Sequence, residues 1–257
     1  MDADKKLQSR ATIACMAQRL TNQVVVVVGA SSGIGRETAI LFAREGARVM
    51  AAARREDRLS GLKKELAAEG HGIEIAIADA SKVGDMDRLI ADTRKKLGEI
   101  DILVYNTGTN VKDRALNRLT PATWDMMISV NLSGAYYATQ AVLPSMRERK
   151  AGHLIYVASI SGIVPDISGA AYQAAKRGVL GLAHAVRVEE KENGIRTCVV
   201  CPGLVDTEIL ANRPVQPSAE TLAMAMQPVD VAEAILAVAK MPARVAVPEM
   251  QVMPTYL

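Results

Sequence analysis

One segment near the start of the chain is especially informative about the fold: Val24-Val25-Val26-Val27-Val28-Gly29-Ala30-Ser31-Ser32-Gly33-Ile34-Gly35. The valine run predicts a strand, and the glycine turn that follows it opens a helix. Glycines allow a tight turn and a close approach of the backbone to a pyrophosphate, whose charge is favoured at a helix N-terminus. The spacing is G-x-x-x-G-x-G, not the general G-x-G-x-x-G. An ordinary strand-to-helix turn would explain one glycine but not three, so the segment predicts a dinucleotide site.

Short β-rich runs alternate with longer helical patterns along the rest of the chain, which is typical of parallel βαβ units. The expected strands are 24–28, 48–53, 73–78, 102–105, 153–158, 197–200 and 245–252. The expected helices begin near Gly33, Glu56, Lys82, Pro121, Ala171 and Val229. These seven strands and six major helices predict an α/β protein. We expect a single-domain Rossmann fold, with a doubly wound seven-stranded parallel sheet and helices on both faces.

The domain organisation is simple, because no stretch resembles a linker and no internal repeat occurs. Residues 23–257 are expected to form the one folded domain, after an N-terminal arm at 1–22. The segment at about 203–227 is predicted to be irregular, since it contains Pro214 and Pro217 and follows a strand. Ligands bind at the carboxyl ends of strands in such sheets, so this segment is predicted to be a substrate lid.

Composition excludes several classes of function. Of the 257 residues, 49% are hydrophobic and 23% are charged, which is ordinary for a globular protein. The net charge of +3 is too balanced to predict binding to nucleic acid, and 3% aromatic residues offer no stacking platform. Apolar runs such as 24–28 are too short to span a membrane, and the N-terminus does not resemble a secretory signal. We therefore expect a cytoplasmic protein with no membrane or nucleic-acid partner.

Cysteine and histidine are sparse. Three cysteines suit a reducing compartment. Cys198 and Cys201 have the spacing of a redox motif, but side chains three apart on a strand point to opposite faces. The three histidines show no spacing typical of metal ligands. No metal site is expected.

The end of the second predicted strand indicates which dinucleotide binds. An NAD site usually has a carboxylate there for the ribose 2′-hydroxyl, but this chain has Ala53 followed by Arg54. A guanidinium suits phosphate oxygens, so Arg54 predicts a 2′-phosphate and hence NADP(H). Arg55 or Arg36 is a candidate to assist, and the alternative for Arg55 is a solvated residue that starts the next helix.

A second constellation lies in Tyr172-Gln173-Ala174-Ala175-Lys176. Residues four apart share a helix face, so the Lys176 ammonium is expected beside the Tyr172 phenol. A cation there lowers a tyrosine pKa that starts near ~10, which favours proton transfer near neutral pH. Ser159 stands thirteen residues upstream, with Ser161 as its rival.

These motifs together resemble the short-chain dehydrogenase/reductase family from Gln23 to the C-terminus. The glycine loop matches the family pattern T-G-x-x-x-G-x-G except at Val28. Ala78-Asp79 matches the segment whose acid contacts adenine, and Tyr105-Asn106-Thr107-Gly108 resembles N-N-A-G with two positions changed. Pro202-Gly203 resembles the motif that meets the nicotinamide.

The resemblance implies catalysis by four residues: Asn131, Ser159, Tyr172 and Lys176. NADP(H) would exchange a hydride with the substrate while Tyr172 exchanges a proton, Ser159 would position the oxygen, and Asn131 would support a water relay from Lys176. It also implies the following cofactor-binding residues: Gly29, Ser31, Ser32, Gly33, Ile34, Gly35, Arg54, Arg55, Asp79, Ala80, Asn106, Gly108, Tyr172, Lys176, Pro202, Gly203, Val205 and Thr207.

Several alternatives stay open at this point. A sugar-nucleotide epimerase or dehydratase would share the loop and the Tyr/Lys pair but usually has a larger C-terminal region. A sensor or scaffold would bind NADP(H) without turnover. Candidate substrates are a small hydroxy acid or semialdehyde and a 3-oxoacyl thioester, with steroids and sugars not excluded. Arg114 and Arg213 either bind an anionic group or are solvated. The resemblance further implies a homodimer or homotetramer.

Overall fold

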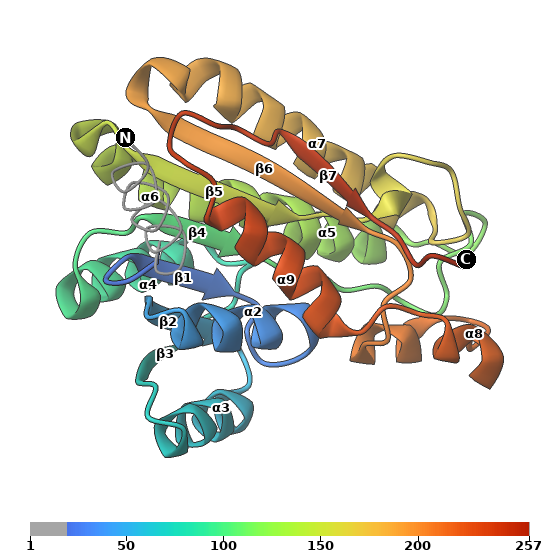
Figure 1. Ribbon diagram of the computed structural model, residues 1–257. Coiled ribbons are helices and arrows are strands. Elements are labelled where there is room, and N and C mark those ends of the chain that lie inside the picture. Colours follow the sequence, from blue (N-terminus) through green and yellow to red (C-terminus); the bar gives the residue numbers. More distant parts are fainter. Residues whose placement is uncertain (1–19, 257) are drawn as a thin grey trace, which may run out of the picture.

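In the computed structural model, which describes residues 20–256, seven parallel strands form one sheet in the order β3-β2-β1-β4-β5-β6-β7 (Figure 1). The strands are β1 (Val24–Val28), β2 (Arg48–Ala53), β3 (Ile73–Ile77), β4 (Ile102–Tyr105), β5 (Gly152–Val157), β6 (Ile195–Pro202) and β7 (Glu249–Val252). The predicted fold class is confirmed. The predicted arm at 1–22 lies outside the described residues up to residue 19, and Leu20 is buried.

Strand β1 lies in the middle of the sheet. Val25 pairs with Val49 of β2 on one side and with Ile102 of β4 on the other. All five of its residues are buried, because a central parallel strand has helices over both faces. The strand order reverses direction between β1 and β4, which opens a crevice at the carboxyl ends of these two strands.

Helices cover both faces of the sheet (Figure 1). Phe42 of α2 (Gly33–Arg44), Leu59 of α3 (Glu56–Ala68) and Ile235 of α9 (Pro228–Ala239) belong to the core on one face. The core on the other face contains residues of α4 (Val83–Leu97), α6 (Gly134–Arg149) and α7 (Ala170–Glu190). Cys198 lies in the first core and Cys201 in the second, so the two thiols are on opposite faces, as predicted.

The helix predicted to begin near Pro121 is longer and less regular than a single α-helix. It begins as α5 (Pro121–Ile128), where Thr120 caps the N-terminus by accepting a hydrogen bond from the Thr123 amide. It continues through a π-helical turn, Ser129–Ser133, directly into α6. Such turns are often found at functional sites, and this one contains Asn131.

The segment at 203–227, predicted to be irregular, contains two short helical pieces. A 3-10 helix spans Glu208–Asn212, and α8 spans Ala219–Ala223 with Ser218 as its cap. The prediction of an irregular segment was therefore wrong in detail, because side-chain caps and local turns suffice for such short helices. Figure 1 shows α8 on the side of the molecule where the carboxyl ends of the strands lie.

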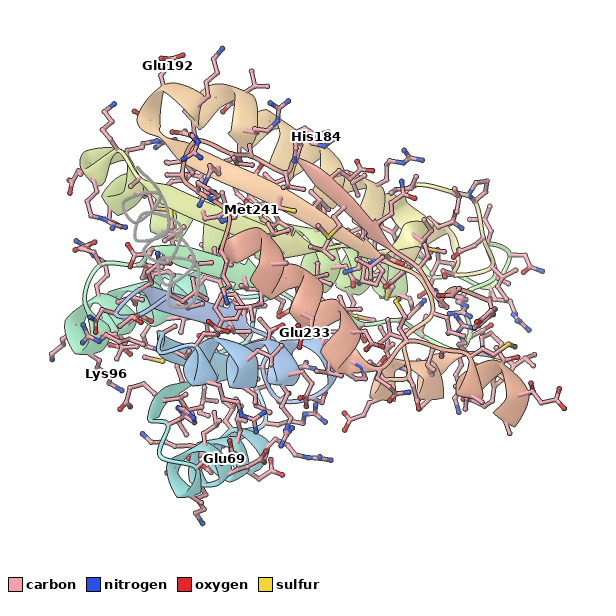
Figure 2. All side chains as sticks on the ribbon, viewed as in Figure 1. Glu69, Lys96, His184, Glu192, Glu233 and Met241 are labelled. Atoms are coloured by element: carbon pink, nitrogen blue, oxygen red, sulfur yellow. The ribbon has the colours of Figure 1, made fainter. Side chains whose placement is uncertain are left out.

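Charged side chains project outward from the helices (Figure 2). Those of Glu69, Lys96, Glu192 and Glu233 are exposed. Within residues 20–256, none of the helices has the length and hydropathy needed to cross a membrane. The same residues contain no group of three or more His, Cys, Asp or Glu side chains placed to hold a metal ion.

Candidate active site

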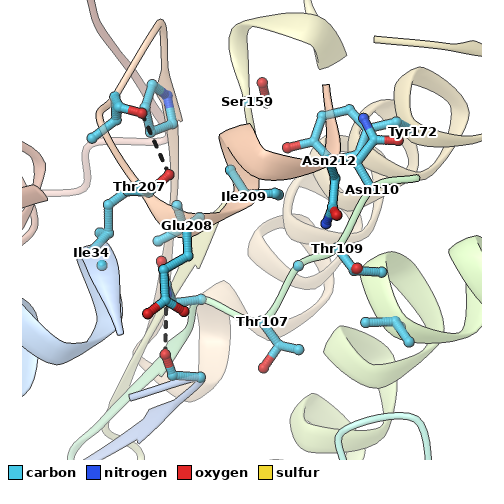
Figure 3. Close-up of a pocket in the computed structure, with 18 of the residues that line it drawn as sticks. Ile34, Thr107, Thr109, Asn110, Ser159, Tyr172, Thr207, Glu208, Ile209 and Asn212 are labelled. Carbon is cyan, nitrogen blue, oxygen red and sulfur yellow. Dashed lines mark hydrogen bonds between the residues drawn. The ribbon is translucent and has the colours of Figure 1, made fainter. Parts of the chain in front are cut away.

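A cleft of about 520 Å³ lies at the carboxyl ends of β1, β4, β5 and β6. Figure 3 shows side chains from both sides of it, with Thr207 and Ile209 of the segment after β6 opposite Thr107 and Thr109 of the loop after β4. Most of the residues predicted from the sequence line this cleft: Gly29, Ser31, Ser32, Gly33, Ile34, Arg54, Arg55, Asp79, Ala80, Asn106, Gly108, Ser159, Tyr172, Lys176, Pro202, Gly203, Val205 and Thr207. Gly35 and Asn131 do not line the cleft.

The glycine loop is held by close backbone contacts. Gly29 has φ +93°, and a Cβ on it would lie 2.9 Å from the Thr107 nitrogen. A Cβ on Gly35 would lie 2.2 Å from the Gly29 oxygen. Both positions therefore require glycine, Gly29 for its dihedral angle and Gly35 for the tight fold of the loop over the start of α2.

The start of α2 faces the cleft with features that suit an anion. Ser32 is the N-cap residue but its side chain does not cap the helix, and the first turn contains no acidic residue. Free backbone N–H groups and the helix dipole together favour a phosphate at this position.

Two arginines follow β2. The Arg55 guanidinium donates to the hydroxyls of Ser31 at 2.9 Å and Ser32 at 2.7 Å, and it pairs with Glu208 of the 3-10 helix after β6 at 2.8 Å. It therefore lines the cleft, while its side chain is 42% exposed and it is also the N-cap residue of α3, so its role in binding stays a prediction. Arg36 pairs with Glu37 and Glu65 and does not line the cleft, so the structure gives it no role there.

Arg54 and Asp79 lie on the same part of the cleft wall. Burial raises the pKa of Asp79, but hydrogen bonds from Ser81 and the charge of Arg54 outweigh it and hold that pKa below its ordinary value. The carboxylate is thus ionised at neutral pH. No ion pair within residues 20–256 involves Arg54, so its guanidinium is free to meet a ligand.

Tyr172 and Lys176 lie near the N-terminus of α7, and Lys176 Nζ is 5.6 Å from the centre of the Tyr172 ring. The predicted juxtaposition is confirmed. The Lys176 ammonium also donates to the carbonyl of Val157 at 3.1 Å, which fixes it at the end of β5. Lys176 is buried and Tyr172 is partly buried.

The predicted direction of the Tyr172 pKa shift was wrong for the protein alone. Burial raises the pKa of Tyr172 to about 12, against smaller opposing effects of the Ser159 hydroxyl and of the charges on Arg114 and Arg213. Burial also lowers the pKa of Lys176 to about 8. Desolvation disfavours both charged forms, and a sequence pattern does not reveal how deep the pair lies.

The two candidate serines differ in their partners. Ser161 donates to the carboxylate of Asp166, so its hydroxyl is engaged within its own loop. The Ser159 oxygen receives the Ser161 amide at 3.2 Å, and its hydroxyl lies close enough to Tyr172 to influence the phenol pKa. Ser159 is the serine placed beside the tyrosine.

Asn131 is fully buried in the π-helical turn and supports the loop after β4. Its side chain accepts a hydrogen bond from the Thr109 amide at 3.0 Å and donates to the Met127 carbonyl at 2.9 Å. A Cβ on Gly108 would lie 3.2 Å from both Asn131 Oδ1 and Lys176 Nζ. Asn131 is thus next to the lysine across a glycine, and its part in a water relay remains a prediction.

A second tyrosine, Tyr156, occupies a different environment. It is fully buried in β5, its hydroxyl lies 2.7 Å from that of Thr139 in α6, and it does not line the cleft. This pair joins the sheet to its helix layer. Among these tyrosines, Tyr172 is the one exposed to the cleft.

The sequence interpretation missed Asp166 and Glu208 as members of the cleft. Glu208 pairs with a residue 153 positions away in the sequence, and no local pattern indicates such a contact. Asp166 organises the loop before α7 by accepting hydrogen bonds from Ser161 and Ser168. A Ser-x-x-x-x-Asp spacing in a loop is too common to have indicated this.

Comparisons with known proteins agree with this geometry. The chain matches the short chain dehydrogenase family over residues 23–217. It is 35% identical over 192 residues to an uncharacterized oxidoreductase of Staphylococcus aureus (strain MRSA252), which covers 75% of this chain and 82% of that protein.

Solved structures are similar over nearly the whole chain. The closed form of serine dehydrogenase complexed with NADP+ is 32% identical with a TM-score of 0.82, over 90% of this chain and 94% of that one. A variant of actinorhodin polyketide ketoreductase with NADPH is 31% identical with a TM-score of 0.82, over 93% and 98%. With its glycine loop, sheet order and cleft, the chain belongs to the short-chain dehydrogenase/reductase family of oxidoreductases.

Proposed function

We propose that this protein interconverts a carbonyl and an alcohol with NADP(H) as the hydride carrier. The observation that carries the proposal is the convergence of Ser159, Tyr172 and Lys176 on one cleft that also contains the glycine loop. Each of these residue types is common alone. Together they supply a group to hold a substrate oxygen, a proton donor and a cation beside it.

The residues present fit a dinucleotide with a 2′-phosphate. The glycine loop and the start of α2 would hold the pyrophosphate, Asp79 and Ala80 would lie at the adenine, and Arg54 and Arg55 would hold the 2′-phosphate. The NADP+ and NADPH complexes of the similar structures support this assignment.

The bound cofactor would supply or accept the hydride, and the protein would control the proton. The pKa of Tyr172, raised to about 12, keeps the phenol protonated at neutral pH, so it would donate to a carbonyl oxygen during reduction. Ser159 would hydrogen-bond the same oxygen as negative charge develops on it. Lys176, held by Val157, would stabilise the phenolate that remains and contact the nicotinamide ribose.

Asn131 would complete the catalytic set without touching the substrate. Its hydrogen bonds to Thr109 and Met127 hold the loop beside Lys176, where a water molecule would carry a proton toward bulk solvent. We therefore assign it a positioning role. Pro202, Gly203, Val205 and Thr207 would close the nicotinamide end.

The substrate would be small and partly apolar. Leu204, Ile209 and Leu210 of the lid line the cleft beyond Tyr172. A hydroxy acid or semialdehyde and a 3-oxoacyl thioester are both consistent with this lining. We expect action in the cytoplasm, where the free thiols of Cys198 and Cys201 stay reduced.

A homodimer or homotetramer is the expected assembly. Trp124 of α5 and Val188 of α7 are 37% and 57% exposed, and such apolar side chains on long helices suit a subunit interface. Sedimentation that shows only a monomer would contradict this expectation.

Replacing Tyr172 by Phe tests the proposal, with Tyr136→Phe on the exposed surface of α6 as the matched control. Tyr172→Phe removes the transferable proton, so it should lower carbonyl reduction at least ~1000-fold while NADPH binding stays within about twofold. Tyr136→Phe should leave both quantities unchanged.

Substantial activity in Tyr172→Phe would show the mechanism to be wrong. NADPH binding by the wild-type protein without turnover of any carbonyl in a broad panel would favour a sensor or scaffold instead.

A further inference from the structure

A buried arginine without a partner lies at the substrate end of the cleft. Arg114 lines the cleft but is only 8% exposed, and its Nε is buried without a hydrogen-bond partner. No ion pair or side-chain hydrogen bond joins its guanidinium to any other residue within 20–256. A buried cation with no direct ion pair or hydrogen bond is costly, so its presence in a cleft is consistent with a ligand that pairs with it.

The backbone around Arg114 holds its side chain in place. Asn110 donates from its side chain to the carbonyl of Ser168 at 3.1 Å, which joins the loop after β4 to the loop before α7. Gly169, with φ +91°, lets Arg114 approach so closely that an added Cβ would lie 2.9 Å from the arginine Cβ. Gly169 is three residues before Tyr172, so the same turn positions both the cation and the proton donor.

The charges near Arg114 define what it can bind. Arg213 of the lid lies close enough for its charge to lower the pKa of Arg114, an effect second to that of burial. Both arginines also act on the pKa of Tyr172, so all three groups share one end of the cleft. Asp166 is the opposing charge nearby, but its oxygens accept hydrogen bonds from Ser161 and Ser168 rather than pairing with Arg114.

We propose that Arg114, assisted by Arg213, binds the carboxylate of the substrate, so that the protein acts on a short-chain hydroxy acid and its oxo acid. This inference rests on the proposed oxidoreductase function and names its substrate class. The planar guanidinium accepts a carboxylate in a two-point hydrogen bond, which orients the substrate as well as binding it. Ser159, Tyr172 and the two arginines line one cleft and both arginine charges act on Tyr172, so the carbonyl carbon would lie within a few bonds of the carboxylate.

The reaction is balanced without any further reactant. In the oxidative direction the carbinol C–H bond would break, and its electron pair would pass as hydride to the nicotinamide of bound NADP+. The hydroxyl proton would pass to Tyr172 in its phenolate form, reached after the phenol has released its own proton to solvent, and a C=O bond would form. The carboxylate on Arg114 is unchanged, so it contributes binding and orientation only.

The test compares acids with neutral analogues of the same shape. Oxo acids of three to five carbons and their methyl esters are assayed with NADPH, using the wild-type protein, Arg114→Gln, and Arg118→Gln as control. Arg118 lies in the same loop but is exposed and paired with Asp113. The wild type should prefer the acid, and Arg114→Gln should lower kcat/KM for the acid about 100-fold but for the ester less than about threefold. Arg118→Gln should change neither.

One further variant and one further substrate test the role of Arg114. If Arg114→Gln does not fold, Arg114→Lys retains the charge and should keep the preference for acid over ester. A phosphorylated ketone is the third probe, since phosphate fits the same guanidinium. Turnover of the phosphate ester but not of the acids would overturn the carboxylate assignment.

Equal kcat/KM values for acid and ester in the wild type would overturn the inference while leaving the oxidoreductase in place. If no carbonyl is reduced, calorimetry with butyrate and butyramide in the presence of NADP+ decides the case. Binding of butyrate that depends on Arg114 would support the anion site even though the proposed function had failed. No binding of butyrate would refute the site as well.

Discussion

The ion pair between Glu208 and Arg55 leads to a prediction about cofactor discrimination. Glu208 Oε2 lies 2.8 Å from Arg55 Nη1, and Oε1 lies 3.6 Å from Arg58 Nη2. The hydrogen bond from Arg55 lowers the pKa of Glu208, so the carboxylate is ionised at neutral pH. In the protein alone, this carboxylate occupies the guanidinium that we assign to the 2′-phosphate.

The expected magnitude follows from exposure and charge. Arg55 and Glu208 are 42% and 49% exposed, so their pair contributes about 1 kcal/mol or less. A phosphate of about two charges on the same guanidinium would lie about 5 Å from the carboxylate, and salt-screened repulsion there costs about 1–2 kcal/mol. Glu208→Gln removes that repulsion and should tighten NADPH binding about 5–30-fold. NADH lacks the 2′-phosphate, so its affinity should change less than about twofold.

Fluorescence titration with each cofactor measures this difference. The control is Glu220→Gln, which removes the same charge from α8 but does not line the cleft. The gain for NADPH should shrink between about 50 mM and about 500 mM NaCl, because salt screens the repulsion. Equal tightening of both cofactors, or no change for NADPH, would refute the assignment of the phosphate to Arg55.

Three other predictions concern single residues. Arg54→Ala should raise the KM for NADPH at least ~10-fold with little effect on NADH, and equal effects would contradict an NADP(H) site. Gly35→Ala places a Cβ 2.2 Å from the Gly29 oxygen, so it should lower the free energy of unfolding by about 2 kcal/mol or more. The control Gly61→Ala has open space around it in α3 and should raise the free energy of unfolding by up to about 1 kcal/mol. Denaturant unfolding measures both changes. Burial lowers the pKa of His153 to about 3. Below pH ~6.5 the histidine therefore gains a proton only in the unfolded chain, and the free energy of unfolding falls by up to ~1.4 kcal/mol per pH unit as the pH falls toward 3. His153→Leu should make this dependence on pH less steep.

The central sheet could be predicted because its physical signal is local. Strand β1 is buried on both faces, and the sequence shows this directly as five consecutive valines. The glycine turn was equally visible, since Gly29 and Gly35 have contacts that no larger residue allows. The boundaries of β7 were less visible: the predicted strand began at Val245, but pairing with β6 begins only at Glu249.

The features that sequence reasoning missed depend on contacts between residues far apart in the sequence or on how deeply a side chain is buried. Nothing in the pattern of residues 121–149 indicates a π-helical turn at Asn131, and the hydrogen bond of this residue to Thr109 joins positions 22 apart in the sequence. The i, i+4 spacing placed Lys176 beside Tyr172 correctly. It did not give the direction of the Tyr172 pKa shift, because that direction depends on how deeply the two groups are buried in the folded chain, which the spacing does not contain.

The corrected pKa changes how the site is understood to work. Burial raises the pKa of Tyr172 to about 12, so its phenol is protonated at neutral pH, the form that the proposed reduction needs. Oxidation needs the phenolate, and the cations available to stabilise it are Lys176, Arg114 and Arg213. A substrate carboxylate would neutralise the two arginines and leave Lys176 as the cation beside the phenol. In the proposed mechanism the lysine's hydrogen bond to Val157 would therefore matter, because it would hold that one charge in place whichever substrate is bound.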